Sequence, residues 1–150
     1  MSPNFQLASP TDLEILLPLM GEYYNFEGIV FDDAKARRAM GGLLADARYG
    51  LAWIIRVDNA VAGYMVVCFG YGLESGGRDA FIDELYLRPS FRGQGIGTQA
   101  MKIMIEACRI HGVHVVYLEV GPENELAIRY YAKAGFIERG FGLMACPIEP

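Results

Sequence analysis

The sequence predicts one α/β domain, and three observations lead to that prediction. Segments rich in Val, Ile and aromatic residues, typical of strands, lie between segments whose apolar residues recur at helical spacing. The length of 150 residues suits a single core. A hydrophobic content of 53% with 21% charged residues excludes a disordered chain. We therefore expect residues 1–150 to form one domain.

The N-terminal third predicts a short strand followed by two helices. Phe5–Ala8 has the strand pattern, and Ser9–Asp12 supplies a helix cap before apolar residues at helical spacing. This first helix is expected to end near Tyr24. A second helix is expected from Asp32 to Leu44, with Gly41-Gly42 as an interruption.

The middle of the chain predicts three strands. Leu51–Val57 and Val61–Phe69 are separated by Asp58-Asn59, which favours a hairpin. Tyr71–Gly77 is rich in glycine and predicts a turn. Ala80–Leu87 is expected to be the third strand. It should end there, because Pro89 follows and cannot continue the pairing of a strand.

The C-terminal part predicts two helices and three strands. Gly95–Ile110 carries apolar residues three and four positions apart, and Asn124–Ala134 is expected as a second helix closed by a glycine. Val113–Val120 is almost entirely apolar, so we expect a strand buried on both faces. Phe136–Arg139 and Gly142–Pro147 are expected as two final strands.

Composition and charge disfavour several classes of protein. The 18 acidic and 13 basic residues give a net charge of −5, which disfavours nucleic acid and favours a cationic partner. No apolar run approaches the roughly 18 residues that a membrane helix needs, and no secretory signal is recognisable, so we expect a cytoplasmic protein. The three cysteines and two histidines lack the spacing of metal ligands, so no metal is expected.

A glycine-rich turn before the helix Gly95–Ile110 is the strongest chemical motif. Gly93, Gly95 and Gly97 allow the backbone to approach a phosphate closely, and Arg92 adds a charged donor. The free N–H groups and the dipole at the start of the helix also attract an anion. The turn therefore predicts a pyrophosphate-binding site.

Other phosphate sites fit this turn less well. A Walker loop requires Gly-Lys-Ser/Thr, and here Thr98 follows Gly97 without a lysine. A dinucleotide site is the stronger alternative, because Gly95–Ala100 satisfies G-x-G-x-x-A and Glu119 ends the next strand. However, Arg88–Gln94 separates the strand from the first glycine of that motif, and only about 30 residues remain for the rest of such a fold.

Three motifs together resemble the GNAT superfamily of N-acetyltransferases. Arg92–Gly97 matches the family's R/Q-x-x-G-x-G/A cofactor loop, and Ile82–Pro89 resembles the strand that precedes it. Asn124–Phe136 resembles the C-terminal motif, with Tyr131 at its tyrosine position. The resemblance covers about 55 residues, and the residues and spacing of the motifs are most similar to those of the diamine and polyamine acetyltransferase-like members.

This resemblance implies a GNAT-like fold, a single twisted mixed sheet with helices on both faces, and acetyl-CoA as co-substrate. The strands at Phe81–Leu87 and Val113–Val120 would be parallel neighbours that splay apart. The splay would leave backbone groups of Leu85, Tyr86 and Leu87 for the pantetheine arm. The resemblance implies further contacts with the cofactor in the glycine-rich turn and in the C-terminal motif. These residues are Arg92, Gly93, Gln94, Gly95, Ile96, Gly97, Thr98, Asn124, Ala127 and Tyr131.

Acetylation of an amine requires two proton movements. An alkylammonium has a pKa of about 10.4, so a base must take its proton, and the leaving thiolate gains from a nearby acid. The resemblance makes Tyr131 the candidate acid, with the adjacent Tyr130 as its rival. Asp83 and Glu84 are the candidate bases, although some members of the family have no dedicated base. Strict alternation along the strand would send these two carboxylates to opposite faces, and the residues do not decide which one faces the amine.

The acceptor is expected to be a primary amine of a small molecule, of polyamine or amino-acid type. In the GNAT-like fold the region around the first two helices covers the acceptor site, which makes Tyr24 and Glu27 candidates to bind a cationic amine. A catalytically silent acyl-CoA-binding sensor is the alternative function. Apolar residues near the C-terminus, such as Phe141 and Leu143, predict a homodimer.

Overall fold

The computed structural model describes residues 2–148. These residues form two compact units that divide after Leu118. The first unit holds a five-stranded sheet and three α-helices, and the second holds one α-helix and chain without regular structure. Whether the two units act as one domain stays a prediction.

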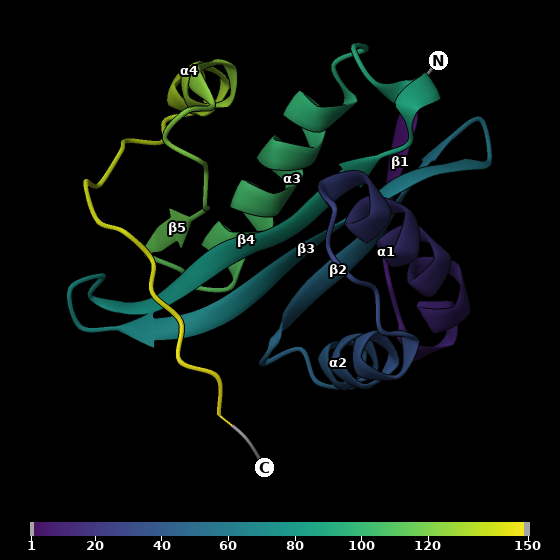
Figure 1. The fold of residues 1–150 in the computed structure, drawn as a ribbon, viewed down its shortest axis with the longest axis horizontal. Helices are drawn as coiled ribbons and strands as arrows, with labels where there is room; N and C mark the ends of the chain where they lie inside the picture. The colour runs from purple at the N-terminus through teal and green to yellow at the C-terminus, as the bar shows by residue number, and fades with distance from the viewer. Residues whose placement is uncertain (1, 149–150) are drawn as a thin grey trace. The chain divides into compact units, whose positions relative to one another are not determined.

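The sheet of the first unit is mixed, with its strands in the order β1-β2-β3-β4-β5 (Figure 1). The first four strands pair antiparallel: β1 (Pro3–Leu7), β2 (Gly50–Val57), β3 (Ala60–Gly72) and β4 (Gly77–Leu87). The fifth, β5 (Val115–Tyr117), runs parallel to β4. The predicted mixed sheet is confirmed.

Two hairpins connect the three central strands. Asp58 and Asn59 turn β2 into β3 with φ angles of 49° and 68°, as a tight turn with two positive φ values requires. The second hairpin is longer than predicted, because Tyr71 pairs with Arg78 and Gly72 pairs with Gly77. Pairing between the strands outweighs the weak strand propensity of glycine, so the turn is confined to residues 73–76.

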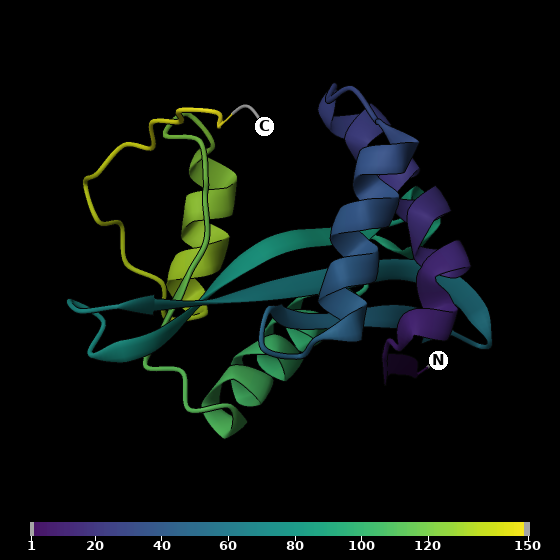
Figure 2. The ribbon, with the colours of Figure 1, turned by 90° about the horizontal axis from the view of Figure 1, so that it is seen from below.

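Helices cover both faces of the sheet, as predicted. Figure 2 shows α1 (Leu13–Glu27) and α2 (Asp33–Ala45) on one side and α3 (Ile96–Ile110) on the other. The first face buries one apolar cluster, made of Leu16, Leu17, Leu19, Met20, Ala36, Met40, Ala52, Ile54, Tyr64, Val66 and Tyr86. Alternate strand residues point the other way, toward the buried side chains of α3.

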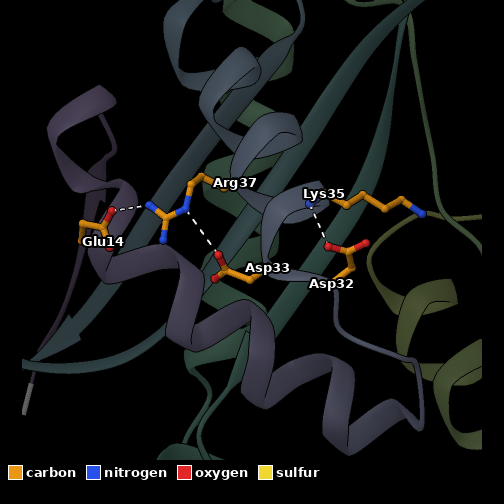
Figure 3. A network of polar contacts seen from close by, with 5 residues as sticks. All are labelled: Glu14, Asp32, Asp33, Lys35 and Arg37. Carbon is orange, nitrogen blue, oxygen red and sulfur yellow. Dashed lines mark hydrogen bonds and ion pairs between the residues drawn. The ribbon is translucent and has the colours of Figure 1, made fainter.

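The start of α2 is fixed by a cap, by an ion pair within the helix and by one ion pair to α1. The Asp32 side chain accepts a hydrogen bond from the backbone N–H of Lys35 at 3.1 Å (Figure 3). Arg37 pairs with Asp33 on its own helix and with Glu14 on α1. These contacts join the two helices at their exposed surface.

The predicted interruption of α2 is wrong. Gly41 and Gly42 lie inside the continuous helix, where each costs about 1 kcal/mol relative to alanine. The cap at Asp32 and the burial of Ala36 and Met40 on the sheet offset this cost.

The predicted strands of the C-terminal part are wrong in two respects. β5 has only three residues, which are half-buried, and it pairs only with Asp79–Phe81 of β4. The residues after α4 (Glu125–Lys133) form no strand up to residue 148, although both 136–139 and 142–147 have strand-like sequences. A short extended segment is stable only against a partner strand, and local sequence does not supply one.

Candidate active site

The glycine-rich turn has the geometry of an anion site. It follows β4 through a short helical turn, Pro89–Phe91, and ends at the N-terminus of α3. Gly93 and Gly95 have φ angles of 74° and 81°, which disfavour any side chain. No described side chain caps α3, and the backbone of Gln99 donates to the carbonyl of Gly95 in the first turn. The amides of Ile96 and Gly97 thus lie in the first turn, at the positive end of a 15-residue helix, which suits a pyrophosphate.

The side chains of this turn brace it from within. The Gln94 side chain donates to the carbonyl of Ser90 at 3.0 Å. The Arg92 Nε donates to the carbonyl of Leu87 at 2.8 Å, and its guanidinium lies 4.5 Å from the Phe26 ring centre. Arg92 therefore ties the turn to the end of α1, whereas its predicted contact with phosphate stays a prediction.

The splay between β4 and β5 occurs where the resemblance implied it. The last paired residues are Phe81 and Tyr117, so β4 continues through Leu85, Tyr86 and Leu87 without a β5 partner. Backbone groups on that edge of β4 are available for another hydrogen-bonding partner. The Leu87 carbonyl accepts from Arg92 on this edge, and the Arg88 N–H donates to Ala62 of β3 on the other. Because backbone groups alternate along a strand, those of Leu85 lie on the open edge, whereas those of Tyr86 face its partner Tyr64 on β3.

A β-bulge breaks the alternation predicted for the two acids of β4. Ile82 lies opposite Val67 and Glu84 lies opposite Val66, so Asp83 is an extra residue without a partner on β3. The charge of Asp83 raises the pKa of both Tyr24 and Glu84, which shows that the carboxylates are near neighbours. The prediction that the two acids diverge to opposite faces is therefore wrong.

Glu84 is held by two tyrosine hydroxyls from different elements. Tyr24 of α1 donates to Oε2 at 2.6 Å, and Tyr64 of β3 donates to Oε1 at 2.7 Å. Phe31 packs edge-on against Tyr24, with ring centres 5.6 Å apart. The carboxylate thus lies in an aromatic environment on the face of the sheet that α1 covers.

Burial dominates the electrostatics of this group. It raises the pKa of Glu84, and the neighbouring Asp83 raises it further, whereas the two tyrosine hydrogen bonds lower it. Burial also raises the pKa of Asp83, whose side chain is crowded by protein atoms although it reaches solvent. Burial, with smaller contributions from both acids, raises the pKa of the Cys68 thiol to about 11. Among the described residues no cation pairs with Glu84, so its raised pKa makes it a stronger base than an exposed carboxylate.

Another glutamate, Glu22 of α1, has the opposite environment. Arg88 donates to both oxygens of Glu22, through Nε at 3.0 Å and Nη2 at 2.8 Å. The Tyr86 hydroxyl donates to the same carboxylate at 3.3 Å. The hydrogen bonds and charge of Arg88 lower the pKa of Glu22 below its usual value, so this carboxylate is held as an ion. Glu27, the predicted substrate residue, is exposed in the last turn of α1.

The C-terminal motif lies in the second unit. Asn124 caps α4, and its side chain accepts from the backbone N–H of Ala127 at 3.1 Å. Tyr131 is half-buried near the end of α4, packed against Tyr130 and Phe136 at ring-centre distances of 5.3 and 5.9 Å. Burial raises the pKa of Tyr131, so its hydroxyl keeps its proton near neutral pH.

Tyr64 is the site residue that sequence reasoning missed. It lies in the apolar run of β3, directly opposite Tyr86, and is fully buried. A hydroxyl in a run that is otherwise apolar is a signal, because a buried tyrosine needs a hydrogen-bond partner. The partner itself could not be identified without the register of β3 on β4.

Comparison with known proteins agrees with this geometry. The sequence matches the Acetyltransferase (GNAT) family over residues 17–136. The chain belongs to this family. As a member of this family it is an acetyl-CoA-dependent N-acetyltransferase, and acetyl-CoA is its co-substrate. The uncapped start of α3 and the positive φ angles of its turn fit the phosphates of that co-substrate.

Curated relatives of this GNAT protein align with segments of different length. An uncharacterized N-acetyltransferase of Methanocaldococcus jannaschii is 43% identical over 60 residues, which are 40% of this chain and 26% of that protein. The L-methionine sulfoximine/L-methionine sulfone acetyltransferase of Pseudomonas paraeruginosa is 25% identical over 139 residues, 91% of this chain and 81% of that protein. The thialysine N-epsilon-acetyltransferase of Mus musculus is 33% identical over 77 residues, 51% of this chain and 45% of that protein.

Solved structures share the GNAT fold over nearly the whole chain. An integron cassette protein from the mobile metagenome of Cole Harbour Salt Marsh has a TM-score of 0.86 and 30% identity, over 97% of this chain and 91% of that one. A predicted acetyltransferase of Clostridium acetobutylicum, crystallised with acetyl-CoA, has a TM-score of 0.82 and 22% identity, over 97% and 96% of the two chains. The second likeness shows the fold alone.

Two further findings apply to residues 2–148. No helix in this stretch has the length and apolar character to cross a bilayer. It also contains no group of three or more His, Cys, Asp or Glu side chains placed to hold a metal ion.

Proposed function

We propose that this acetyltransferase moves the acetyl group of acetyl-CoA to a primary amine of a small cationic molecule, of polyamine or amino-acid type. The observation that carries the proposal is Glu84, a half-buried carboxylate with two tyrosine donors and no cationic partner among the described residues. A buried acid without a counter-ion is costly unless it serves a ligand of opposite charge. Asp83 adds a second negative charge beside it.

Glu84 is the general base in this proposal. The incoming ammonium is held by the two carboxylates and by the aromatic ring of Tyr24, which can attract a cation. Glu84 takes one proton, directly or through a water molecule, and the neutral nitrogen then bonds to the acetyl carbon as the carbon–sulfur bond breaks. The nitrogen loses its second proton as the amide forms, and this proton replaces the one that Tyr131 gives to the leaving thiolate. Glu27, exposed at the end of α1, is a further anionic contact for an acceptor with more than one positive charge.

Tyr131 is the general acid in this proposal. It occupies the tyrosine position of the C-terminal motif, and a tyrosine hydroxyl carries its proton near neutral pH and can donate it to the leaving thiolate. Acetyl-CoA itself is bound by the amides of the turn, by Arg92 and by the backbone groups of Leu85 on the open edge of β4. Asn124 and Ala127 supply contacts at the start of α4.

Two relatives support an amino-acid-like acceptor. One is a thialysine N-epsilon-acetyltransferase and the other acetylates L-methionine sulfoximine and L-methionine sulfone, so both act on amines of amino-acid derivatives. The acceptors of both enzymes are amino acids, so they also contain a carboxylate. The polyamine type lacks that carboxylate, and the net charge of −5 favours it.

The test measures CoA release from acetyl-CoA with a panel of amines: a diamine, a polyamine, a lysine-like ω-amine, an α-amino acid and an aminoglycoside. We expect turnover with a cationic small amine, and a loss of about 10²-fold or more in kcat for Tyr131→Phe. Tyr130→Phe is the matched control, since it removes a hydroxyl from the adjacent position of α4, and we expect it to retain wild-type turnover.

The alternative function, a silent acyl-CoA sensor, makes a different prediction. A sensor binds acetyl-CoA in calorimetry but releases no CoA with any amine, and Tyr131→Phe leaves it unchanged. Binding without turnover across the whole panel would therefore replace the proposed function with the sensor.

A further inference from the structure

The two oxygens of the Glu84 carboxylate have partners of different kinds. Oε1 accepts from Tyr64, whose side chain is fully buried, and Oε2 accepts from Tyr24, whose side chain is half-buried. Both are charge-assisted hydrogen bonds when the carboxylate is ionised, and together they fix the plane of the carboxyl group. The two oxygens therefore differ in access although they belong to one group.

Tyr64 has no freedom to leave its partner. It lies in the middle of β3, and its ring packs near those of Tyr23 and Tyr86, with ring centres 6.4 Å from each. Rotation of the ring away from Glu84 would leave a buried hydroxyl and a buried carboxylate oxygen without partners, at the cost of both desolvation penalties. Oε1 is thus anchored to the core of the sheet.

Tyr24 is placed differently, near the C-terminal end of α1. The chain leaves the helix at Gly28, and Phe31 packs on the Tyr24 ring from the connection to α2. A carboxylate oxygen has two lone pairs, so Oε2 can accept from Tyr24 and still take a proton from a ligand. Oε2 is therefore the oxygen that an acceptor can reach.

The other ionisable groups that the structure describes around Glu84 do not supply a positive charge. Asp83 on β4 and the half-buried Cys68 on β3 interact electrostatically with it, and Tyr23 lies beside Tyr24 on α1. The guanidinium of Arg88 is bonded to Glu22 and to the carbonyl of Val61. Among residues 2–148, the two hydroxyl donors are the groups that offset the burial of the Glu84 charge.

We propose that Tyr64 is a positioning residue that anchors Oε1 of Glu84, so that Oε2, shared with Tyr24, is the oxygen that accepts the proton of the acceptor amine. This inference rests on the proposed function. Tyr24 keeps its own proton, because burial and the Glu84 charge raise its pKa well above the usual value. The proton that leaves the ammonium therefore resides on the carboxyl group and not on the tyrosine.

The first test reads the Glu84 carboxyl directly and needs no turnover. In protein labelled at the side-chain carboxyl carbon of glutamate, the Glu84 signal is assigned by its absence in Glu84→Gln and titrated by NMR. We expect Tyr64→Phe to move its midpoint to higher pH, because a lost hydroxyl donor destabilises the ionised form. Tyr86→Phe is the matched control, since its hydroxyl donates to Glu22, and it should leave the Glu84 midpoint in place. An unmoved midpoint in Tyr64→Phe overturns the anchor.

The second test separates positioning from binding. Tyr64→Phe is expected to lower kcat about tenfold or more with little change in KM for the amine, and to move the acidic limb of kcat/KM to higher pH. Tyr24→Leu removes the ring that holds the ammonium and is expected to raise KM for the amine more than Tyr64→Phe does. Thermal unfolding confirms that both variants fold, and a kcat loss in Tyr64→Phe without any movement of the acidic limb shows a structural role only. Failure of the wild type to acetylate any amine counts against the proposed function, and the carboxyl titration still decides the anchor.

Discussion

Two glutamates, Glu22 on α1 and Glu84 on the strand β4, have opposite environments. Glu22 accepts two hydrogen bonds from the guanidinium of Arg88, and its pKa lies below the usual value. Glu84 accepts two hydrogen bonds from neutral tyrosines, and burial holds its pKa above the usual value. The first arrangement satisfies the charge within the protein. The second leaves it to be satisfied by a ligand, which is why we assign the chemistry to Glu84.

The largest expected effect separates the two glutamates by activity. Glu84→Gln removes the base and keeps the shape, so we expect kcat/KM for the amine to fall by about 10²–10⁴-fold near neutral pH. Glu22→Gln removes a carboxylate of the same type that is bonded to Arg88, and its kcat should stay within a few fold of wild type. Steady-state kinetics with the best amine measure both. Equal losses in the two variants would remove the distinction on which the assignment depends.

The next effect separates them by stability, with opposite signs. Burying the Glu84 charge costs free energy once the pH exceeds the unfolded value of 4.5, so Glu84→Gln should raise the free energy of unfolding at pH 8, by about 1 kcal/mol, and hardly change it near pH 4. Glu22 has a lowered pKa, so its contribution is complete above 4.5 and is lost as the pH falls through its folded value. Glu22→Gln should therefore destabilise by about 0.5–1 kcal/mol at pH 8, a range that allows for its partial exposure.

Denaturant unfolding of both variants at the two pH values measures these changes. We expect the changes in the free energy of unfolding caused by Glu84→Gln and by Glu22→Gln to diverge as the pH rises. A destabilised Glu84→Gln variant at pH 8 would show that the tyrosine hydrogen bonds outweigh the burial of the charge.

The smallest effect is expected at an ion pair that lies outside this comparison. Arg37 bridges Asp33 and Glu14 at the exposed surface of α1 and α2. Arg37→Gln should lower the melting temperature slightly at low salt, and the difference should vanish in about 1 M salt, where the Debye length is only about 3 Å. A loss that persists in high salt would indicate that the aliphatic part of Arg37 contributes by packing.

Much of the fold could be predicted because its determinants are local. The turn at Asp58-Asn59, the cap at Asp32 and the glycines before α3 each act over a few residues, and each is found where the sequence places it. The C-terminal strands could not be predicted in this way. The segments 136–139 and 142–147 have strand-like composition, but a strand also needs a partner, which is a property of tertiary structure.

The site shows the same limit at the level of single residues. The sequence analysis proposed Asp83, Glu84 and Tyr24 as site residues, and the structure brings them together, but strict alternation gave the wrong relation between the two acids. The bulge that brings them together arises from the register of β4 on β3, where Glu84 opposes Val66 and Ile82 opposes Val67. Tyr64 was missed for the same reason, since its role follows from a contact between residues 20 positions apart on different strands.

The most direct test of the central claim is the pH dependence of kcat/KM for the best amine, measured for wild type and Glu84→Gln at saturating acetyl-CoA. The claim predicts that wild-type activity rises with pH through an ionisation that lies above the usual range of a carboxyl group and that Glu84→Gln lacks. An identical rate and an identical pH profile in the two proteins would contradict it and show that another group takes the proton.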